Sequence, residues 1–91
     1  MTRVTFAKAI QRHVDCPPAD VVGDTLREAL DAYFEIHPSV RRYVLDDQNA
    51  VRRHVAVFLD NDLITDRDSL ADLVGPTSTV AVFQALSGGA A

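Results

Sequence analysis

Residues 23–38, GDTLREALDAYFEIHP, predict one amphipathic helix, and this helix decides the class of fold. Thr25 and Glu28 have the spacing of a capping box, in which the hydroxyl and the carboxylate each bond a free backbone N–H group. Gly23 lets the chain turn into the helix, and Pro38 cannot continue it. The apolar stripe of such a helix must be covered by a second layer, so we expect the rest of the chain to supply a sheet. The stripe consists of Leu26, Ala29, Leu30, Tyr33, Phe34 and His37.

Alternating and β-branched residues before and after this helix predict strands. Residues 2–10 and 11–16 predict two adjoining strands, with a hairpin as the simplest connection. Residues 51–59 and 63–64, separated by a short polar turn, predict a second hairpin. Residues 79–86 predict a last strand that is apolar on both faces, which is typical of the centre of a sheet.

Two further segments are less regular. Residues 39–45 predict a short turn and strand, and residues 66–74 predict one loose helical turn that carries Leu70 and Leu73. The predicted order of elements is therefore β-β-α-β-β-β. It indicates an α+β fold in which a mixed sheet of four to five strands packs against one main helix.

Composition limits the class of protein. The 91 residues suffice for one small domain, and a hydrophobic fraction of 47% is typical of a globular chain. The formal net charge of -4 argues against nucleic-acid binding, which usually comes with a basic excess. No apolar run approaches the roughly 20 residues of a membrane-spanning helix, and no signal peptide opens the chain, so we expect a cytoplasmic location. Cys16 is the single cysteine, so no internal disulfide is expected.

The sequence predicts no catalytic or metal-binding constellation. The His and Cys residues are few and lack zinc-finger spacing, so packing and surface roles are favoured over metal binding. The aspartates of the turns lack the glycine and the closing glutamate of a calcium loop, which favours a solvated acidic face. Neither a phosphate-binding glycine loop nor a serine nucleophile elbow is present. The His and Cys residues are His13, Cys16, His37 and His54.

Two short basic segments, one before the long helix and one after it, admit two interpretations. They are either ordinary solvated charges or, where their segments lie near each other, a small positive patch that steers an acidic partner. Phe58 lies on the same face of its predicted strand as His54, and it joins the candidate docking residues. These candidates are Arg12, His13, Arg52, Arg53, His54 and Phe58.

Residues 87–91, Ser-Gly-Gly-Ala-Ala, are predicted to form a flexible tail behind a domain of residues 1–86. A Gly-Gly pair has no side chains and adds nothing to a core. The tail is therefore either a frayed chain end or a narrow segment that threads into the active site of another protein. In the second interpretation, Ser87 and Gly88 are the threading residues.

The order of these pieces resembles the MoaD/ThiS family of sulfur-carrier proteins, which have a ubiquitin-like β-grasp fold. The resemblance covers nearly the whole chain and rests on "GDTLREAL", "VAVFLDNDLI", "VGPTSTVAVFQAL" and "SGG". It implies a carrier rather than an enzyme, with Gly89 as the site of sulfur attachment. In the family, an ATP-using activating enzyme adenylates the terminal glycine, and the resulting thiocarboxylate donates its sulfur to a biosynthetic enzyme. The carrier itself binds no cofactor.

Ala90 and Ala91 depart from the family pattern, because they leave Gly89 in a peptide bond instead of a free carboxylate. The resemblance implies that a metalloprotease cleaves between Gly89 and Ala90. The expected role is sulfur delivery for cysteine or another sulfur-containing metabolite. The alternatives are a ubiquitin-like modifier joined through Gly89 to protein lysines, the small subunit of molybdopterin synthase, and a binding module whose tail does no chemistry.

Overall fold

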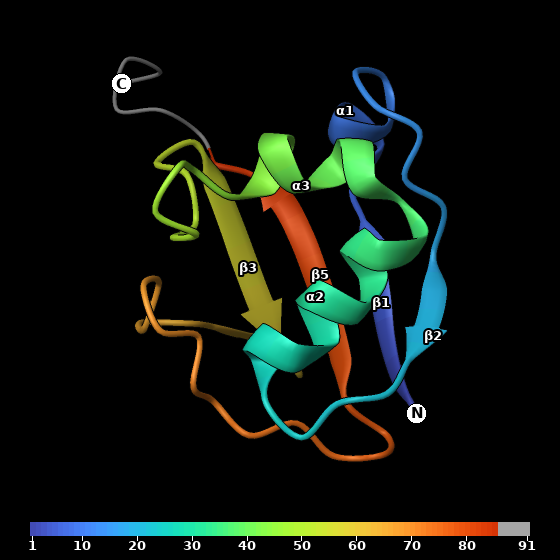
Figure 1. Cartoon of the computed structure of the whole chain (residues 1–91), viewed down its shortest axis with the longest axis vertical. Helices are drawn as coiled ribbons and strands as arrows, with labels where there is room; N and C mark the ends of the chain where they lie inside the picture. The colour runs from blue at the N-terminus through green and yellow to red at the C-terminus, as the bar shows by residue number, and fades with distance from the viewer. Residues whose placement is uncertain (86–91) are drawn as a thin grey trace.

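A five-stranded mixed sheet forms one layer of the computed structural model, which describes residues 1–85 (Figure 1). The elements are β1 (Thr2–Phe6), α1 (Lys8–Gln11), β2 (Ala19–Val21), α2 (Leu26–Ile36), α3 (Pro38–Val44), β3 (Val55–Leu59), β4 (Asp62–Leu63) and β5 (Thr79–Gln84). The strand order is β2-β1-β5-β3-β4. β5 lies at the centre, parallel to β1 and antiparallel to β3, which confirms the position predicted from its two apolar faces.

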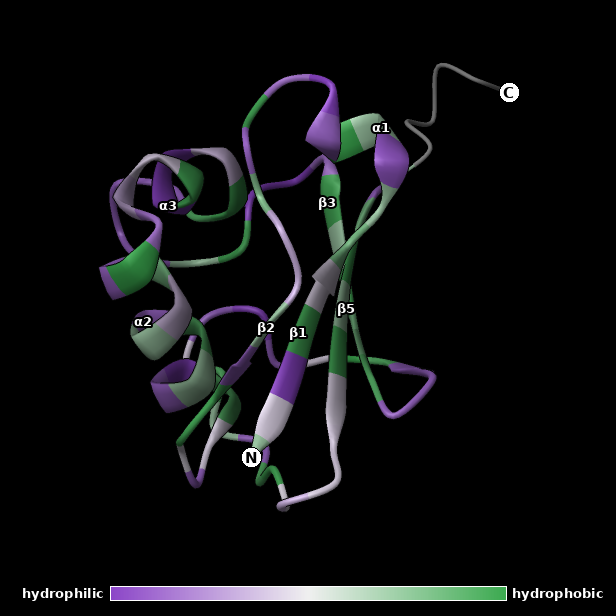
Figure 2. Cartoon of the chain, turned by 90° about the vertical axis from the view of Figure 1, so that its right-hand side faces the viewer, coloured by the Kyte–Doolittle hydropathy of each residue, from purple (hydrophilic) through white to green (hydrophobic). Residues whose placement is uncertain are grey.

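Helix α2 packs its apolar stripe against one face of the sheet, as predicted. Leu26, Leu30 and Tyr33 are fully buried, and they share one core with Val80 and Val82 of β5. Each fully buried side chain of this size stabilises the fold by about 1.5–3 kcal/mol. Figure 2 shows α2 and α3 on the same side of the sheet, while its other face is open. The domain therefore has two layers, with α2 and α3 on one face of the sheet.

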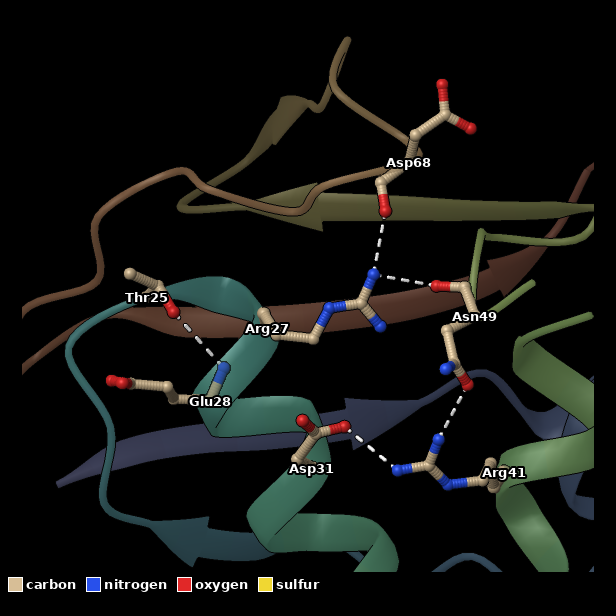
Figure 3. Close-up of polar contacts among 7 residues, drawn as sticks. All are labelled: Thr25, Arg27, Glu28, Asp31, Arg41, Asn49 and Asp68. Atoms are coloured by element: carbon tan, nitrogen blue, oxygen red, sulfur yellow. Dashed lines mark hydrogen bonds and ion pairs between the residues drawn. The ribbon is translucent and has the colours of Figure 1, made fainter.

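The start of α2 is a capping box in which one bond is displaced by a residue. The Thr25 hydroxyl accepts a hydrogen bond from the Glu28 N–H at 3.2 Å (Figure 3). The Glu28 carboxylate accepts from the N–H of Asp24 at 2.8 Å, and not from that of Thr25. Both bonds satisfy backbone donors at the helix start, so the predicted function of the pair is confirmed.

The chain between β1 and β2 differs from the prediction. The two strands do pair antiparallel, but residues 7–10 are not part of a strand, and residues 11–16 form none. Helix α1 lies there instead, and the second strand comes after the prolines. The helix turn buries Ile10 completely, and the Ala7 N–H donates to the carbonyl of Val82 at 2.9 Å. Burial of Ile10 against the core overrides a weak alternating pattern.

The segment after α2 is also different, because residues 39–44 belong to α3 and not to a turn and strand; only Leu45 is extended, in an isolated antiparallel bridge with Val51. Pro38 follows the end of α2, as predicted, but it also begins the next helix. It occupies the first turn of α3, where its missing N–H would have had no partner in any case. Val40 and Val44, one helical turn apart, are both fully buried. This spacing is the sequence signal for α3, although the segment is short.

The predicted second hairpin is confirmed, with Phe58 opposite Leu63. Its turn places Asp60 and Asn61 at positive φ, a conformation that Asp and Asn adopt more readily than most residues. The strand itself is shorter than predicted, because it begins at Val55 and not at residue 51.

Residues 66–74 form a loop without the predicted helical turn. Asp66 organises it, since its carboxylate accepts from the N–H groups of Ala71 and Ser69 at 3.0 and 2.9 Å. These bonds, to Ala71 above all, lower the pKa of Asp66. Leu70 is fully buried at φ 53, a left-handed conformation that a helical turn does not contain, whereas Leu73 is 79% exposed.

Arginine side chains connect this loop to the helices. Arg27 of α2 donates to the carbonyls of Asn49 and Asp68, both at 2.7 Å (Figure 3). Arg41 of α3 reaches the Asn49 side chain at 2.8 Å and the Asp31 carboxylate at 3.0 Å. The planar guanidinium group suits such multiple bonding, and it fixes the loops without a regular element.

Candidate functional site

The chain leaves the described domain at one end of the sheet, next to His54. Ala85, the first residue after β5, donates its N–H to the carbonyl of His54 at 2.7 Å. Figure 1 shows α1, α3 and this end of β5 at the same end of the molecule. Whatever follows Ala85 therefore starts from this end, which we call the tail end. The predicted tail, residues 87–91, lies outside the described residues, and with it the site residues Ser87, Gly88, Gly89 and Ala90.

The two basic segments meet at the tail end, around an aromatic ring that sequence reasoning missed. The His13 ring stacks on Tyr43 of α3, with centroids 5.9 Å apart and 19° between the planes. His54 meets the same ring edge-on, at 5.7 Å and 84°. Arg12 and Arg53, the chain neighbours of the two histidines, are exposed. We call Arg12, His13, Tyr43, Arg53 and His54 the basic cluster.

Backbone contacts hold both halves of the basic cluster in place. The His13 N–H donates to the carbonyl of Ile10 at 2.9 Å, which closes the end of α1. The turn before β3 is fixed by Arg67, whose guanidinium donates to the carbonyl of Val55 at 2.7 Å and to that of Arg52. Because these segments are tied to the core, the aromatic contact between them is set by the fold.

Arg52, a predicted docking residue, has a partner within the chain. Its Nε donates to the carbonyl of Arg42 at the end of α3, at 2.6 Å. A cation at the C-terminal end of a helix is favourably placed toward the free carbonyls. This contact explains Arg52 structurally, and its docking role stays a prediction.

Phe58 lies on the open face of the sheet instead of in the basic cluster. Its ring meets Phe83 of β5 edge-on at 5.4 Å. Phe83 is 43% exposed and Leu63 is 56% exposed, so large apolar side chains face outward here. They line a hollow that extends to Ala85, where the tail begins. We call Ala56, Phe58, Leu63, Ala81 and Phe83 the apolar sheet face.

The signal for Phe83 was present in the sequence. A strand that is apolar on both sides in a domain with one predicted helix layer leaves one apolar side uncovered. Tyr43 had a weaker signal, because its segment was assigned to a turn and strand. Leu63 belonged to the predicted hairpin, but its exposure depends on the open edge beside β4.

Cys16 is an unreactive core residue. It is 1% exposed, and burial, reinforced by the charge of Asp15, raises the pKa of its thiol. A raised pKa lowers the fraction of thiolate, which is the nucleophilic and metal-binding form, so this environment favours a packing role for Cys16. Across residues 1–85, no three His, Cys, Asp or Glu side chains gather as a group that could hold a metal ion. The same part of the chain contains no helix that is long and apolar enough to cross a membrane.

The mixed sheet, the single helix layer and the central last strand define a ubiquitin-like β-grasp domain. No protein-family model matches the chain, and no curated protein sequence does. Solved structures do match over nearly the full length. SAMP1 from Haloferax volcanii is 24% identical, with a TM-score of 0.75 over 97% of this chain and 98% of that chain.

Two further matches come from bacteria. The Amycolatopsis orientalis BexX/CysO complex contains a chain that is 17% identical, with a TM-score of 0.80 over 98% of this chain and 100% of that one. Mycobacterium tuberculosis CysO, described as an antigen, is 15% identical, with a TM-score of 0.79 over 94% of this chain and 100% of that one. These neighbours are of the MoaD/ThiS type that the sequence resembles, and the predicted fold is confirmed. At these identities the likeness establishes the fold alone.

Proposed function

We propose that this protein is a sulfur carrier whose Gly89, freed by removal of Ala90 and Ala91, is converted to a thiocarboxylate. The observation that carries the proposal is the position of the Gly-Gly pair. Gly89 is the fourth residue after Ala85, the residue that directly follows the central strand of a β-grasp domain. Four residues span at most roughly 13–14 Å, enough to place the glycine carboxyl in a cleft of a second protein while the domain stays outside.

The chemistry suits this arrangement. A carboxylate is a poor electrophile, so an activating enzyme first transfers AMP from ATP to the Gly89 carboxylate and releases pyrophosphate. Hydrosulfide then attacks the acyl carbon and displaces AMP with loss of a proton, which leaves a thiocarboxylate in which sulfur replaces one carboxylate oxygen. Glycine beside the reacting carbon brings no Cβ to collide with a narrow channel. In this scheme ATP belongs to the activating enzyme, and the carrier is a co-substrate with no cofactor of its own.

Partner proteins are a necessary part of the proposal. The carrier requires an activating enzyme, a biosynthetic enzyme that accepts the sulfur, and a metalloprotease that exposes Gly89. The complex of CysO with BexX among the structural neighbours supports a carrier that works through partners. The resemblance implies delivery of sulfur for cysteine or another sulfur-containing metabolite. The proposed location of this delivery is the cytoplasm.

The leading alternative is a protein modifier, in which the activated Gly89 forms an amide with a lysine of a target. The name of the Haloferax neighbour, small archaeal modifier protein 1, supports this alternative. Both functions need the same adenylation, and they differ in the nucleophile that follows. Sulfur gives a thiocarboxylate, whereas a lysine amine gives a conjugate that resists reducing agents.

The test compares the full chain with a chain truncated after Gly89, each mixed with ATP and an activating enzyme that adenylates carriers of the MoaD/ThiS type. We expect pyrophosphate exchange from ATP with the truncated chain only, because the full chain has no free Gly89 carboxylate. Adding a sulfur source should then replace one oxygen with one sulfur in the intact mass. Equal exchange by both chains would contradict the role of Gly89.

A matched variant distinguishes an effect on entry of the tail into the partner's channel from an effect on the folding of the domain. Gly88→Val in the truncated chain adds a branched side chain in the tail, so we expect slower adenylation and an unchanged unfolding transition. Unchanged adenylation would mean that the glycines serve only as a flexible end.

A further inference from the structure

We propose that the basic cluster binds an acidic surface beside the tail channel of the activating enzyme and directs the tail end toward it. This inference rests on the proposed function and assigns a recognition role to residues outside the tail. The His54 carbonyl bonds the N–H of Ala85, so the cluster borders the place where the tail begins. A partner that takes in the tail must come close to the cluster.

Charge is distributed unevenly along the molecule. The whole chain has a formal net charge of -4, yet two exposed arginines and two histidines gather at the tail end. Lys8 and Arg42 are also exposed on the short helices there, while the acidic residues next to the cluster along the chain are Asp15, Asp46 and Asp47. These three carboxylates are outnumbered by the basic side chains of Lys8, Arg12, Arg42, Arg52 and Arg53.

The opposite end carries acidic groups. β3 runs away from the tail end, so its turn with Asp60 and Asp62 lies at the far end of the sheet. Asp24 is at the start of α2 and is joined to the same region, because the Val74 N–H donates to its carbonyl at 2.9 Å. The molecule is therefore polarised, positive at the tail end and negative at the other.

This polarity selects the kind of partner. In the field of an acidic surface, the far end is repelled and the tail end is attracted, so encounters with the tail in front are favoured. A nucleic acid is a poorer match, because a chain of net negative charge with one small basic cluster lacks the extended basic surface that phosphates require. The acidic protein surface is the occupant that the charges favour.

Tyr43 gives the cluster its shape. One phenol ring holds the imidazoles of His13 and His54, which come from segments far apart in the sequence. Removing the ring should let the two basic segments move independently, whereas removing only the hydroxyl should keep both ring contacts. Tyr43→Ala and Tyr43→Phe are therefore a matched pair for the geometry of the cluster.

The first experiment measures kcat/KM for adenylation of the chain truncated after Gly89, at low and high salt. We expect Arg12→Glu with Arg53→Glu to lower kcat/KM by roughly tenfold or more at low salt and by much less at high salt. Arg3→Glu is the control, since Arg3 is exposed and lies opposite Thr79, the first residue of β5, in the strand register. This position is at the end of the sheet away from the basic cluster. Tyr43→Ala should lower kcat/KM, with Tyr43→Phe close to wild type. Wild-type kcat/KM in the double variant at low salt would overturn the proposal.

The second experiment does not depend on the proposed function. A deca-glutamate peptide is titrated into the full chain, and backbone amide shifts are followed by NMR. We expect shifts at residues 12–13, 43 and 53–54 that disappear in the double variant. No shift at these residues, or larger shifts with single-stranded DNA of equal charge, would overturn the acidic-protein partner. If the wild-type chain is not adenylated at all, the proposed function fails, and this titration alone decides the cluster.

Discussion

The two faces of β5 carry similar side chains and differ in what covers them. Val80 and Val82 face α2 and are completely buried, whereas Phe83 faces outward and is 43% exposed. The covered face is apolar because it forms the core. Burial in the core does not account for the apolar character of the open face, and an exposed apolar patch is typical of a contact surface. An apolar residue in the sequence can therefore belong either to the core or to an exposed contact surface. Substitutions on the two faces of β5 should distinguish these two cases.

The largest effect is expected where the covered face meets the helix. Leu30→Ala removes a fully buried side chain of α2 and should lower the free energy of unfolding by about 2–5 kcal/mol. That loss is a large part of the stability of a small domain. Denaturant unfolding followed by circular dichroism measures it. A loss below roughly 0.5 kcal/mol, typical of surface changes, would show that α2 does not contribute Leu30 to the core.

A smaller loss is expected at the entrance to the same helix. A Cβ added at Gly23 would lie 2.8 Å from the N atom of Ala29 and 3.0 Å from the carbonyl carbon of Glu28. These are backbone atoms of α2 and cannot rotate away, so Gly23→Ala should destabilise the fold by about 1–3 kcal/mol. Gly75→Ala is the control, because its nearest neighbour would be the Ser78 hydroxyl at 3.7 Å. Equal unfolding midpoints for the two variants would contradict this prediction.

The elements that sequence predicted well have their cause within a few residues. The capping pair at Thr25, the helical stripe and the polar turn at Asp60 each act locally, and each was confirmed. Helices α1 and α3 were missed because they are short and are stabilised by contacts made elsewhere. Ile10 of α1 and Val40 of α3 are both completely buried in the core. Such contacts exist only once the chain has folded.

The candidate site shows the same division. The residue types of both basic segments were visible in the sequence. The contact between the two segments depends on Tyr43, however, and Tyr43 lies in α3, whose residues were predicted to form a turn and a strand. Phe58 was grouped with the basic docking candidates, but it lies on the sheet face with Phe83 and not in the basic cluster. Sequence supplies the chemistry of a surface more readily than its arrangement, because the arrangement depends on packing between distant segments.

A pH-dependent effect should come from the covered side of the domain. The Tyr33 hydroxyl donates to the carbonyl of Pro17 at 2.6 Å, and burial above all raises the pKa of Tyr33 to about 12. In the unfolded chain a tyrosine titrates near pH 10. Between these values the unfolded state loses a proton that the folded state retains, so the stability present below about pH 10 is lost as the pH rises toward 12.

Tyr33→Phe tests this sign. The variant is less stable at neutral pH, because the Pro17 carbonyl loses its donor, but its unfolding free energy should fall less steeply between about pH 10 and pH 12. Denaturant unfolding at a series of pH values gives both slopes. Parallel slopes for the two proteins would show that Tyr33 does not link folding to alkaline pH.

The smallest effect on stability, and the sharpest contrast between the faces, is expected from two neighbours in β5. Val82→Ala removes fully buried methyl groups and should destabilise the domain by more than about 1 kcal/mol. Phe83→Ala truncates a half-exposed ring and should change the free energy of unfolding by less than about 1 kcal/mol.

The effects of the same two substitutions on adenylation should have the reverse order. The apolar sheet face reaches Ala85 and should contact the activating enzyme, so Phe83→Ala should lower kcat/KM several-fold, while folded Val82→Ala protein should retain it. The contrast between the two faces fails if Phe83→Ala destabilises the domain as much as Val82→Ala and leaves adenylation unchanged. Phe83 would then contribute to stability like a core residue and not to contact with the activating enzyme.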